Sequence, residues 1–553
     1  MIFESGYAIG IDTGGTYTDT VVVNCADESV VATAKSPTTH HDLSLGLSSS
    51  LDKAMQESGI SPDDVKLVSV STTLATNAIV ENKGARVGLF MIGTTKALKL
   101  PVVTLRYVKG GHKITGAEED PLDIESLVDG IQDMAGHVDA YAVCSAMSIK
   151  NPAHELIAEK AISLTDPKPV FCSHTISTRA GQAERAATAV LNARLMPVMK
   201  DFLAGVGKAL DERGLGSSVV VVRGNATPMS MKDAVQRAAE TFASGPASTA
   251  FYGSIYSPAK DALIVDVGGT TTDVTLIRNS KPTIQESGSI IGDWETHVEA
   301  VEMFTVGVGG DSFARINRSG NFEVGPGRVV PLCMAGDIPA PEKWLGKGHE
   351  SHLLKTGPSA EKSSDDAVLK YLFENGPSTF GQIMAGTGLG EIGLGGKVQK
   401  LVREQLVEEV GFTPTDALHV QGHLAIGDKS VSEAAATIMG REFDMDADAF
   451  ADMVLSETRL KIENAMLEHI VRKEIGGNMA GFISGRTSSP LVSFDASLNL
   501  PIVGIGAAAR ELLPEVAERL YTEAVFPSHH EVGNALGAIK MALAKMKEDS
   551  CNE

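Results

Sequence analysis

An eight-residue pattern that occurs twice constrains the fold of this chain more than any other feature. The sequence reads DTGGTYTD from Asp12 and DVGGTTTD from Asp266, and six of the eight positions agree. Each copy lies between runs of β-branched residues, so each is expected to be a tight turn that joins two strands. The copies are about 250 residues apart, which is too far for a solenoid repeat. A duplicated fold with one copy in each half is the simplest interpretation.

The double glycine of each copy lets another group approach the main chain closely. A P-loop would need a strand, then GxxxxGK[ST], then a helix, and this order is not what the sequence predicts here. Successive N–H groups of such a turn form a concave nest for a phosphate oxygen, and threonine hydroxyls add donors. The predicted phosphate-binding residues are Thr13, Gly14, Gly15 and Thr16 in the first copy and Gly268, Gly269, Thr270 and Thr271 in the second.

Asp12 and Asp266 each end a strand that reads as buried. A buried carboxylate is costly unless it holds a metal, a metal-bound water or main-chain donors. Mg²⁺ bridging phosphates asks for only one or two carboxylates and keeps several waters. Both aspartates are therefore predicted to be catalytic and metal-binding, with the two hairpins holding the phosphates of one nucleotide. The alternative is a pair of ordinary hairpin turns with capping aspartates, but a turn alone does not require the same threonines.

Composition limits the classes of function. Hydrophobic residues make up 43% of the 553 residues and charged residues 21%, values typical of soluble proteins, and no apolar run long enough to span a bilayer occurs. The N-terminus lacks the features of a secretion signal, and the five cysteines show no CxxC spacing, so a cytoplasmic protein with reduced thiols is expected. The net charge of -22 disfavours nucleic acid as a partner, because that binding depends on Lys and Arg.

Motifs elsewhere in the chain give these hairpins a family context. The hairpins resemble the phosphate motifs of the sugar kinase, heat-shock ATPase and actin superfamily. With the surrounding motifs, the chain resembles the A-type, ATP-binding subunit of the hydantoinase/oxoprolinase family over most of residues 5–330. The motifs are STTLATNAIVENKGARVGL (71–89), KGGH (109–112), NPAHE (151–155), ERAATAVLNARLMP (184–197), SGPAS (244–248), ETHVEAVEMFTVGVGGDS (295–312), VGIGAAA (503–509) and NALGA (534–538).

The resemblance implies an α/β protein with two ribonuclease-H-like lobes. The first lobe is predicted over residues 1–255, the second over 256–525, and a C-terminal helix and tail over 526–553. The family usually continues with a PGPACYG run after the VGP motif, whereas this chain reads VGPGRVVPLCMAGDIPAPEKW over residues 324–344. Apolar residues at helical spacing then predict a helical insertion in the second lobe at about residues 335–425. This stretch also resembles a winged helix, but the acidic balance of the chain favours a packed insertion over a DNA reader.

Family resemblance also supplies an expected activity. It implies ATP-dependent ring opening of a cyclic amide such as a hydantoin, 5-oxoproline or a lactam, through phosphorylation of the amide carbonyl, with ATP and Mg²⁺ as cofactors and a B-type subunit as partner. The missing PGPACYG run leaves open an ATPase subunit of a ketone carboxylase-like complex. Other possible functions are a small-molecule kinase, a reductive activator and a nucleotide-binding scaffold. The chain is also a candidate for forming a homo-oligomer.

Six more residues are candidates for the site. The resemblance implies that adenosine lies on Gly504 and Gly506. Asp311 follows the glycines Gly309 and Gly310, which are predicted to bind the cofactor, and it is predicted to orient a water or to contact the metal. The alternative for Asp311 is a cap on a helix over residues 312–316.

His112 is predicted to orient the substrate or to ligate a second metal, with Asp120 and Asp123 close by in the sequence. The alternative is a loop histidine bonded to the main chain. Glu184 and Arg185 are interpreted as a surface pair on a helix rather than as catalytic residues.

Overall fold

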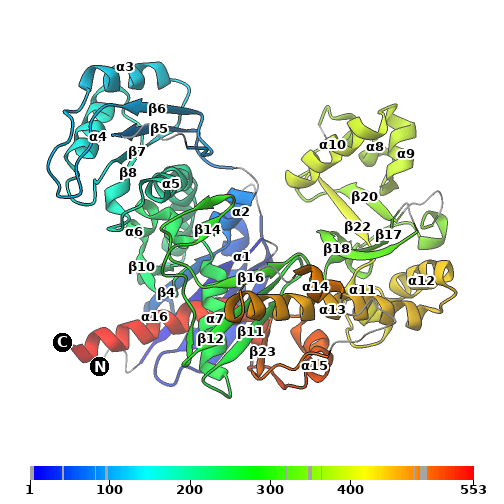
Figure 1. The fold of residues 1–553 in the computed structure, drawn as a ribbon. Coiled ribbons are helices and arrows are strands. Elements are labelled where there is room, and N and C mark those ends of the chain that lie inside the picture. The colour runs from blue at the N-terminus through cyan, green and yellow to red at the C-terminus, as the bar shows by residue number, and fades with distance from the viewer. Residues whose placement is uncertain are drawn as a thin grey trace. The chain divides into compact units, whose positions relative to one another are not determined.

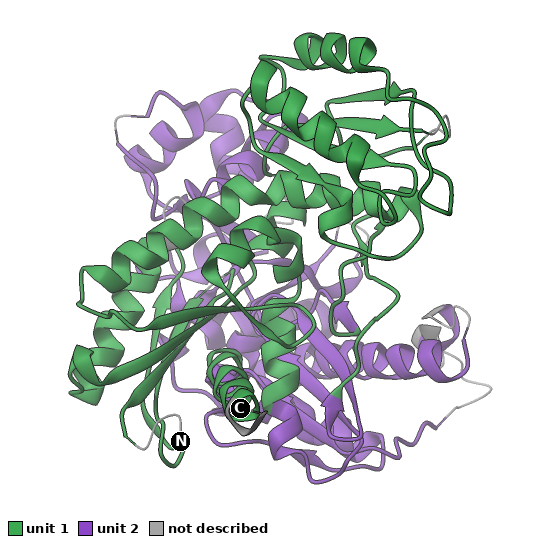
Figure 2. Cartoon of the chain, turned by 90° about the vertical axis from the view of Figure 1, so that its left-hand side faces the viewer, with its two compact units in different colours: residues 1–252, 282–302, 534–553 green, residues 253–281, 303–533 purple. Residues whose placement is uncertain are grey.

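The chain forms two compact units in the computed structural model (Figure 2). The first unit comprises Met1–Tyr252, Pro282–Glu302 and Asn534–Glu553, and the second comprises Gly253–Lys281 and Met303–Gly533. The segment 282–302 and the C-terminal helix thus belong to the same unit as the N-terminal stretch. The structure describes residues 5–15, 17–39, 43–80, 83–93, 98–317, 320–346, 351–362, 364–476, 480–485 and 495–552.

The main sheet of the first unit has the strand order β10-β9-β4-β1-β2-β3. Strand β1 pairs with β2 in antiparallel and with β4 in parallel fashion. Ile9 and Ile11 belong to a core formed with helices α1 and α5, whereas Gly10, on the opposite face, abuts the main chain of α16. The bounds are β1 (Tyr7–Thr13), β2 (Tyr17–Asn24), β3 (Val30–Pro37), β4 (Val65–Thr72), β9 (Ser218–Val222), β10 (Pro228–Ser230), α1 (Leu43–Ser58), α5 (Gln182–Asp211), α7 (Ser244–Tyr256) and α16 (Gly533–Asn552).

A second sheet of the first unit contains four parallel strands in the order β6-β5-β7-β8 (Figure 1). Alternate residues of β5 and β7 enter two different cores, one shared with α3 and α4 and the other with α5. This is the pattern of a parallel sheet covered on both faces. The bounds are β5 (Val87–Ile92), β6 (Thr104–Val108), β7 (Ala140–Ser145), β8 (Val170–Cys172), α3 (Ile124–Met134) and α4 (Ala153–Thr165).

The main sheet of the second unit repeats the topology of the first. Its order is β13-β12-β11-β23-β24, with β11 antiparallel to β12 and parallel to β23, and β16 also pairs with β12. The predicted α/β fold with two ribonuclease-H-like lobes is therefore confirmed. The bounds are β11 (Ala262–Val267), β12 (Thr272–Arg278), β13 (Lys281–Pro282), β16 (Met303–Val306), β23 (Ile502–Ile505), β24 (Ala524–Val525), α13 (Ala447–Glu474) and α15 (Ala509–Arg519).

The insertion in the second unit is not only helical. It holds a four-stranded sheet of order β19-β22-β20-β21 against which α8 and α10 bury apolar side chains. The preceding residues 312–316 form a strand, so the alternative in which Asp311 caps a helix at this position is wrong. The bounds are β17 (Ser312–Ile316), β18 (Phe322–Arg328), β19 (Val330–Pro331), β20 (His352–Thr356), α8 (Ala367–Asn375), β21 (Ser378–Thr379), α9 (Phe380–Thr387), α10 (Glu391–Arg403), β22 (Val407–Gly411), α11 (Pro414–Val420) and α12 (Lys429–Gly440).

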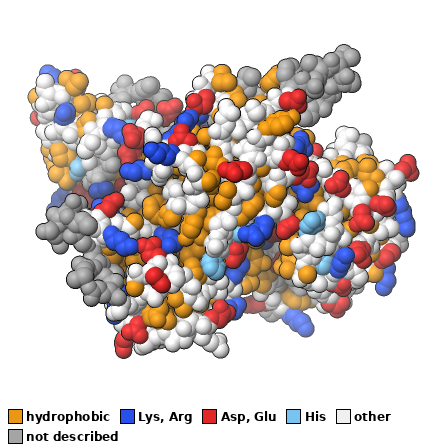
Figure 3. All heavy atoms as spheres, turned by 90° about the horizontal axis from the view of Figure 1, so that it is seen from below, with side chains coloured by type: hydrophobic (Ala, Val, Ile, Leu, Met, Phe, Trp, Pro, Cys, Tyr) orange, Lys and Arg blue, Asp and Glu red, His pale blue; other side chains and the backbone are white. Residues whose placement is uncertain are grey.

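The remaining helices and strands are short. They are α2 (Leu74–Val80), α6 (Met231–Gln236), β14 (Ile290–Ile291), β15 (Trp294–Glu295) and α14 (Ala480–Gly485). None of the helices in the described part of the chain is both long and apolar enough to cross a membrane. On the face drawn in Figure 3, acidic and basic side chains are interspersed. Four cysteines, namely Cys25, Cys144, Cys172 and Cys333, are buried free thiols, as predicted.

Candidate functional site

The first glycine hairpin joins β1 to β2 in the first unit. Its turn is closed by the N–H of Gly14, which donates to the carbonyl of Tyr17 at 3.0 Å. The carbonyl of Thr13 accepts from the N–H of Thr73 at 3.0 Å, which ties the hairpin to the end of β4. Thr16 lies outside the described residues. The predicted strand–turn–strand geometry is therefore present, with its tip at the carboxyl end of β1.

Asp12 is the more deeply buried of the two aspartates of this hairpin, with 2% of its surface exposed against 9% for Asp19. Its Oδ1 accepts from the hydroxyl of Ser71 at 2.6 Å, and its Oδ2 accepts from the Nδ2 of Asn534 at 3.4 Å. Asn534 in turn accepts from the hydroxyl of Thr249. Burial raises the pKa of Asp12, while Ser71, Asn534 and Lys35 oppose the shift. The carboxylate is thus fixed in place but lacks full compensation of its charge.

The second hairpin joins β11 to β12 and is closed in the same way, by the N–H of Gly268 and the carbonyl of Thr271 at 3.0 Å. Within the part of the chain that the structure describes, the main-chain N–H groups of Gly269, Thr270 and Thr271 donate to no acceptor. All three residues are partly exposed. Three successive amide donors on one turn form the type of nest that binds an anion.

A glycine loop at residues 307–310 packs closely against the second hairpin and is hydrogen-bonded to it. The N–H of Gly310 donates to the carbonyl of Gly268 at 3.0 Å, and the N–H of Gly309 donates to the hydroxyl of Ser312 at 2.8 Å. A Cβ on Gly309 would lie 2.4 Å from the carbonyl oxygen of Gly268, so only glycine allows this approach. The amides of Gly309 and Gly310 are thus engaged within the protein, and their contact with a cofactor stays a prediction.

Asp311 lies directly over the tip of the second hairpin. Its N–H donates to the carbonyl of Gly269 at 2.7 Å, and a Cβ on Gly269 would lie 2.6 Å from the Oδ2 of Asp311. Burial raises the pKa of Asp311, and the neighbouring Arg328, at 3.3 Å, opposes the shift. The structure therefore brings Asp311 to the predicted phosphate-binding residues, in the turn directly before a strand and not at the start of a helix.

The two late glycines have different surroundings. Gly506 has a φ of +92°, and its N–H and carbonyl both bond to His530. A Cβ on Gly506 would lie 2.9 Å from the Oδ1 of Asp266, so this loop reaches the second hairpin. Gly504 instead contacts the ring of Phe526 in the core. The predicted adenosine contact of both glycines stays a prediction.

His112 belongs to the second sheet of the first unit, in the loop that follows β6. It is buried, its ring centroid lies 4.3 Å from that of His154, and its Nδ1 has no partner among the described residues. Burial and His154 lower its pKa. The two aspartates predicted nearby have other partners, because Asp120 pairs with Lys109 and Asp123 caps α3. A second metal held by these three residues is not supported.

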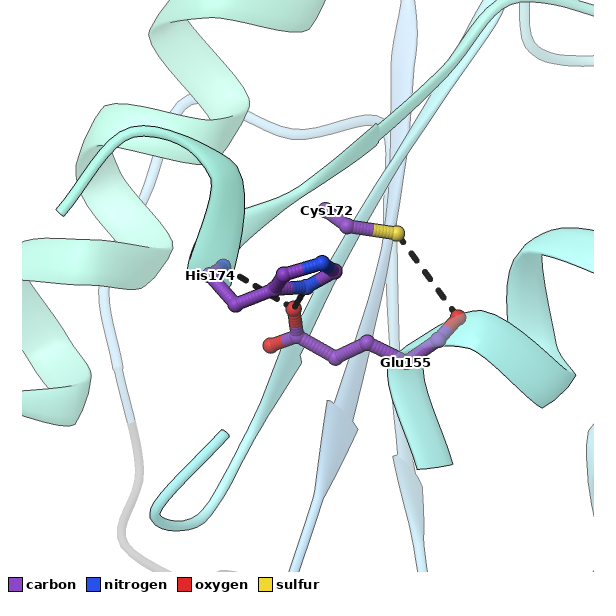
Figure 4. A group of neighbouring side chains, drawn as sticks. All are labelled: Glu155, Cys172 and His174. Atoms are coloured by element: carbon purple, nitrogen blue, oxygen red, sulfur yellow. Dashed lines mark hydrogen bonds and ion pairs between the residues drawn. The ribbon is translucent and has the colours of Figure 1, made fainter. Parts of the chain in front are cut away.

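A hydrogen-bonded cluster in the same sheet was not predicted. Figure 4 shows Glu155, Cys172 and His174 close together, within the reach of a metal ion. The Glu155 carboxylate, however, already accepts from the Nδ1 of His174 at 2.6 Å and from three further donors on Ser145, Ser173 and His174. Burial opposes its charge, but these bonds outweigh burial and hold the pKa of Glu155 below its usual range. The cluster is satisfied without a metal.

Arg185 completes this cluster and is buried, so its interpretation as a surface residue is wrong. Its Nη2 donates to the carbonyl of Ser145 at 2.8 Å, and its Nε donates to the hydroxyl of Ser173. The main chain of Ser145 also donates to Glu155. Two of the motifs quoted above, NPAHE and ERAATAVLN, therefore meet in one network. Their joint presence was the available signal for it.

The fold and the hairpins together define a class of protein: two ribonuclease-H-like units, each with a glycine hairpin and an aspartate at the end of its first strand. Residues 8–165 match the hydantoinase/oxoprolinase N-terminal region, and residues 185–335 match the hydantoinase/oxoprolinase family model that follows it. Together these matches cover more than half of the chain, and the protein belongs to the hydantoinase/oxoprolinase family.

Relatives within the family have different activities. The gamma subunit of acetophenone carboxylase from Aromatoleum aromaticum is 26% identical over 495 residues, 81% of this chain and 62% of the relative. Caprolactamase subunit alpha from Pseudomonas jessenii is 27% identical over 376 residues, 62% of this chain and 52% of the relative. The chain thus spans less than two thirds of the length of either relative.

One solved structure shows the same fold over almost the whole chain. The ATP-dependent caprolactamase from Pseudomonas jessenii superposes with a TM-score of 0.65 at 21% identity, covering 96% of this chain and 70% of that one. At this identity the likeness establishes the fold. It does not by itself transfer the substrate.

Proposed function

We propose that the protein is the ATP-using subunit of a two-subunit enzyme that opens a cyclic amide, such as a lactam, a hydantoin or 5-oxoproline. The observation that carries this proposal is the second hairpin, which carries Asp266 and contacts Asp311, and whose main-chain amides at Gly269, Thr270 and Thr271 have no acceptor among the residues that the structure describes. The same hairpin recurs at Asp12 in the first unit. The family membership and the caprolactamase relative support the choice of substrate class.

The residues present fit ATP with Mg²⁺. The amides of Gly269, Thr270 and Thr271 would bind phosphate oxygens. Asp12 and Asp266 would hold the ion or its waters, and the burial of Asp12 disfavours its charge unless a cation is near. When bound, Mg²⁺ neutralises charge on the phosphates. All of these donors and carboxylates lie at the tips of strands, where rigid pairing orients them.

The chemistry that follows needs orientation more than a nucleophile. An amide carbonyl is a poor electrophile, and transfer of the γ-phosphoryl group of ATP to its oxygen would give an imidate-like carbon that water can attack. Phosphoryl transfer depends mainly on positioning and on charge neutralisation. The chain supplies both through main-chain amides and fixed carboxylates, and no dedicated nucleophile is required.

A second function is favoured by one specific observation. The acetophenone carboxylase subunit matches a larger share of this chain than caprolactamase subunit alpha does, 81% against 62%. Activation of a ketone in place of an amide would use the same hairpins. In either case both relatives are named as subunits, so we propose that this chain also acts with a second subunit, of the B type in the amide-opening case.

The test is phosphate release from ATP by the full chain together with a candidate B-type subunit, measured with a panel of lactams, hydantoins and ketones. Release that depends on a cyclic amide, with the ring-opened amino acid as product, supports the first function. Release that depends on a ketone and bicarbonate, with a carboxylated product, supports the second. Phosphate that ends on an alcohol contradicts both and establishes a kinase. Asp266→Asn should strongly reduce the release, and Asp261→Asn, a partly exposed carboxylate paired with Arg278, serves as its control.

A further inference from the structure

Arg328 ends strand β18 and lies opposite Ser312 in the β17–β18 hairpin. Its Nε and Nη2 both donate to the Oδ2 of Asp311, each at 3.3 Å. Strong arginine–carboxylate pairs use two oxygens at about 2.7–2.9 Å, so this pairing is loose. Within the described residues the other N–H groups of Arg328 donate to no acceptor, and 39% of the side chain is exposed. A guanidinium with unused donors is therefore held at Asp311.

Asp311 fixes where that guanidinium lies. The N–H of Asp311 is bonded to the carbonyl of Gly269, and the N–H of Val329 is bonded to the carbonyl of Asp311 at 3.1 Å. The main chain at Asp311 is thus bonded directly to the second hairpin, and the main chain next to Arg328 is bonded to Asp311. The Oδ2 of Asp311 that accepts from Arg328 also lies 2.6 Å from the place where a Cβ on Gly269 would be. Among the described residues, the amides of Gly269, Thr270 and Thr271 on this hairpin have no acceptor.

The two hairpins differ in the charge of the group that pairs with their second aspartate. In the first hairpin Asp19 pairs across the sheet with Lys35 on β3, and their charged atoms are 3.3 Å apart. In the second hairpin the equivalent aspartate, Asp273, lies opposite Thr305 on β16, whose hydroxyl donates to it at 2.6 Å. The neighbouring strand therefore supplies a cation to the first hairpin and a neutral group to the second.

A polyphosphate on the second hairpin would meet Asp266, Asp273 and Asp311, all acidic. Main-chain amides carry only partial positive charge, and the chain as a whole has a net charge of -22. We propose that Arg328 is a phosphate-binding residue of the second hairpin, with its guanidinium donating to an anionic oxygen of a nucleotide polyphosphate seated on Gly269–Thr271. The proposal rests on the proposed function in that the nucleotide is taken to be ATP.

Position 328 was not part of any predicted site. The sequence around it, VGPGRVVPLC, is where the chain departs from the family pattern, so the resemblance offered no role for it. The planar guanidinium suits a phosphate, because its fork of donors matches two oxygens at once. Asp311, which orients the guanidinium, acts on the phosphate through Arg328 and is a positioning residue in this respect.

The experiment compares binding of ATP and of adenosine by calorimetry for the wild-type chain, Arg328→Ala and Arg328→Lys. Arg315→Ala is the matched control, because Arg315 lies on the same β17–β18 hairpin, pairs with Glu323 at 2.9 Å and is exposed to a similar extent, 45%. Loss of a hydrogen bond to a charged group corresponds to about a 10- to 100-fold weaker affinity. We expect this loss for ATP in Arg328→Ala, a smaller loss in Arg328→Lys, and no change for adenosine or in Arg315→Ala.

Two results would overturn the assignment. One is unchanged ATP affinity in Arg328→Ala, and the other is an equal loss for ATP and adenosine, which would indicate a structural role. Thermal unfolding of each variant identifies a misfolded protein, and Arg328→Lys, which keeps the charge, then carries the comparison. If the wild-type chain binds no ATP, the proposed function fails as well, so the two failures can be told apart.

Discussion

The two glycine hairpins share a sequence pattern and a topology but differ in what holds their aspartates. In the first unit Asp12 lies beside Ser71 in the sheet register and bonds to its hydroxyl. In the second unit the equivalent neighbour of Asp266 is Ile505, which has no side-chain donor. The second hairpin is instead supported by the glycine loop at residues 307–310. The repeated octamer therefore sets the turn and the acidic residue, while each unit supplies its own support.

The largest expected effect comes from neutralising the shared aspartates. Asp12→Asn and Asp266→Asn keep the side-chain shape and remove the charge, and we expect each to lower ATP hydrolysis about 10²- to 10³-fold, as for the loss of one preorganised electrostatic group. Steady-state phosphate release by the full chain with its partner checks this. Asp27→Asn, an exposed residue bonded to Ser29, should leave the rate unchanged. If only one of the two variants loses activity, the two hairpins are not functionally equivalent.

The next largest effect is a loss of stability when a glycine that packs against a hairpin is replaced by alanine, and it should differ between the two hairpins. Gly309→Ala would place a Cβ 2.4 Å from one main-chain oxygen and 2.7 Å from another, so the backbone must move. Overpacking of this kind costs about 1–3 kcal/mol, and we expect the upper end of the range. Gly15→Ala in the first hairpin would only meet the amide end of Asn77, at 3.4 Å. Thermal unfolding should therefore show a clear loss of stability for Gly309→Ala and a small loss for Gly15→Ala.

A matched control for these glycines is available in the insertion. Gly395 lies within α10 and a Cβ there would meet nothing within 4 Å, so Gly395→Ala should leave stability unchanged or slightly raise it. Equal losses in Gly309→Ala and Gly15→Ala would contradict the conclusion that the glycine loop supports the second hairpin alone.

Ser71→Ala tests the hydrogen bond that holds Asp12 in the first hairpin, and the pH dependence of the rate measures its effect. Burial raises the pKa of Asp12, and the bond from Ser71 partly opposes that shift. A role that needs the ionised carboxylate is lost as pH falls through this pKa. Removing the Ser71 hydroxyl removes a donor that favours the charged form, so the pKa rises further and the acidic limb of the pH–rate profile moves to higher pH. We expect the rate at neutral pH to fall about tenfold, from the loss of one hydrogen bond to a charged group.

Ser69→Ala is the control for this variant. Ser69 lies on the same strand, is buried, and donates to the carbonyl of Ala538 at 2.7 Å rather than to Asp12. It should destabilise the chain without moving the acidic limb. If both variants move that limb equally, the effect belongs to the strand and not to the Asp12–Ser71 bond.

Local sequence was sufficient for the hairpins and for the duplicated lobes, because a glycine turn between β-branched runs has few alternatives. It was not sufficient for the partners of Asp12, since Ser71 and Asn534 are 59 and 522 residues away and only the tertiary fold brings them there. The five residues 312–316 (SFARI) are too few for their pattern to distinguish a helix from a strand, and pairing with β18 decides for a strand. Arg185 is expected on the surface as part of a pair on an amphipathic helix, but buried carbonyl and hydroxyl acceptors allow it into the core.

The smallest effect concerns the cation of the first hairpin. Lys35 lies 3.3 Å from Asp19 and also stacks near the ring of Tyr17, but its side chain is 38% exposed, and exposed ion pairs contribute about 1 kcal/mol or less. Among the groups that act on the pKa of Asp12, Lys35 ranks below Ser71 and Asn534. Lys35→Met should therefore move the acidic limb in the same direction as Ser71→Ala but by a smaller amount, and the difference from wild type should shrink as salt is added. A shift larger than that of Ser71→Ala would contradict this ranking, and a shift independent of salt would contradict an effect that acts through an exposed ion pair.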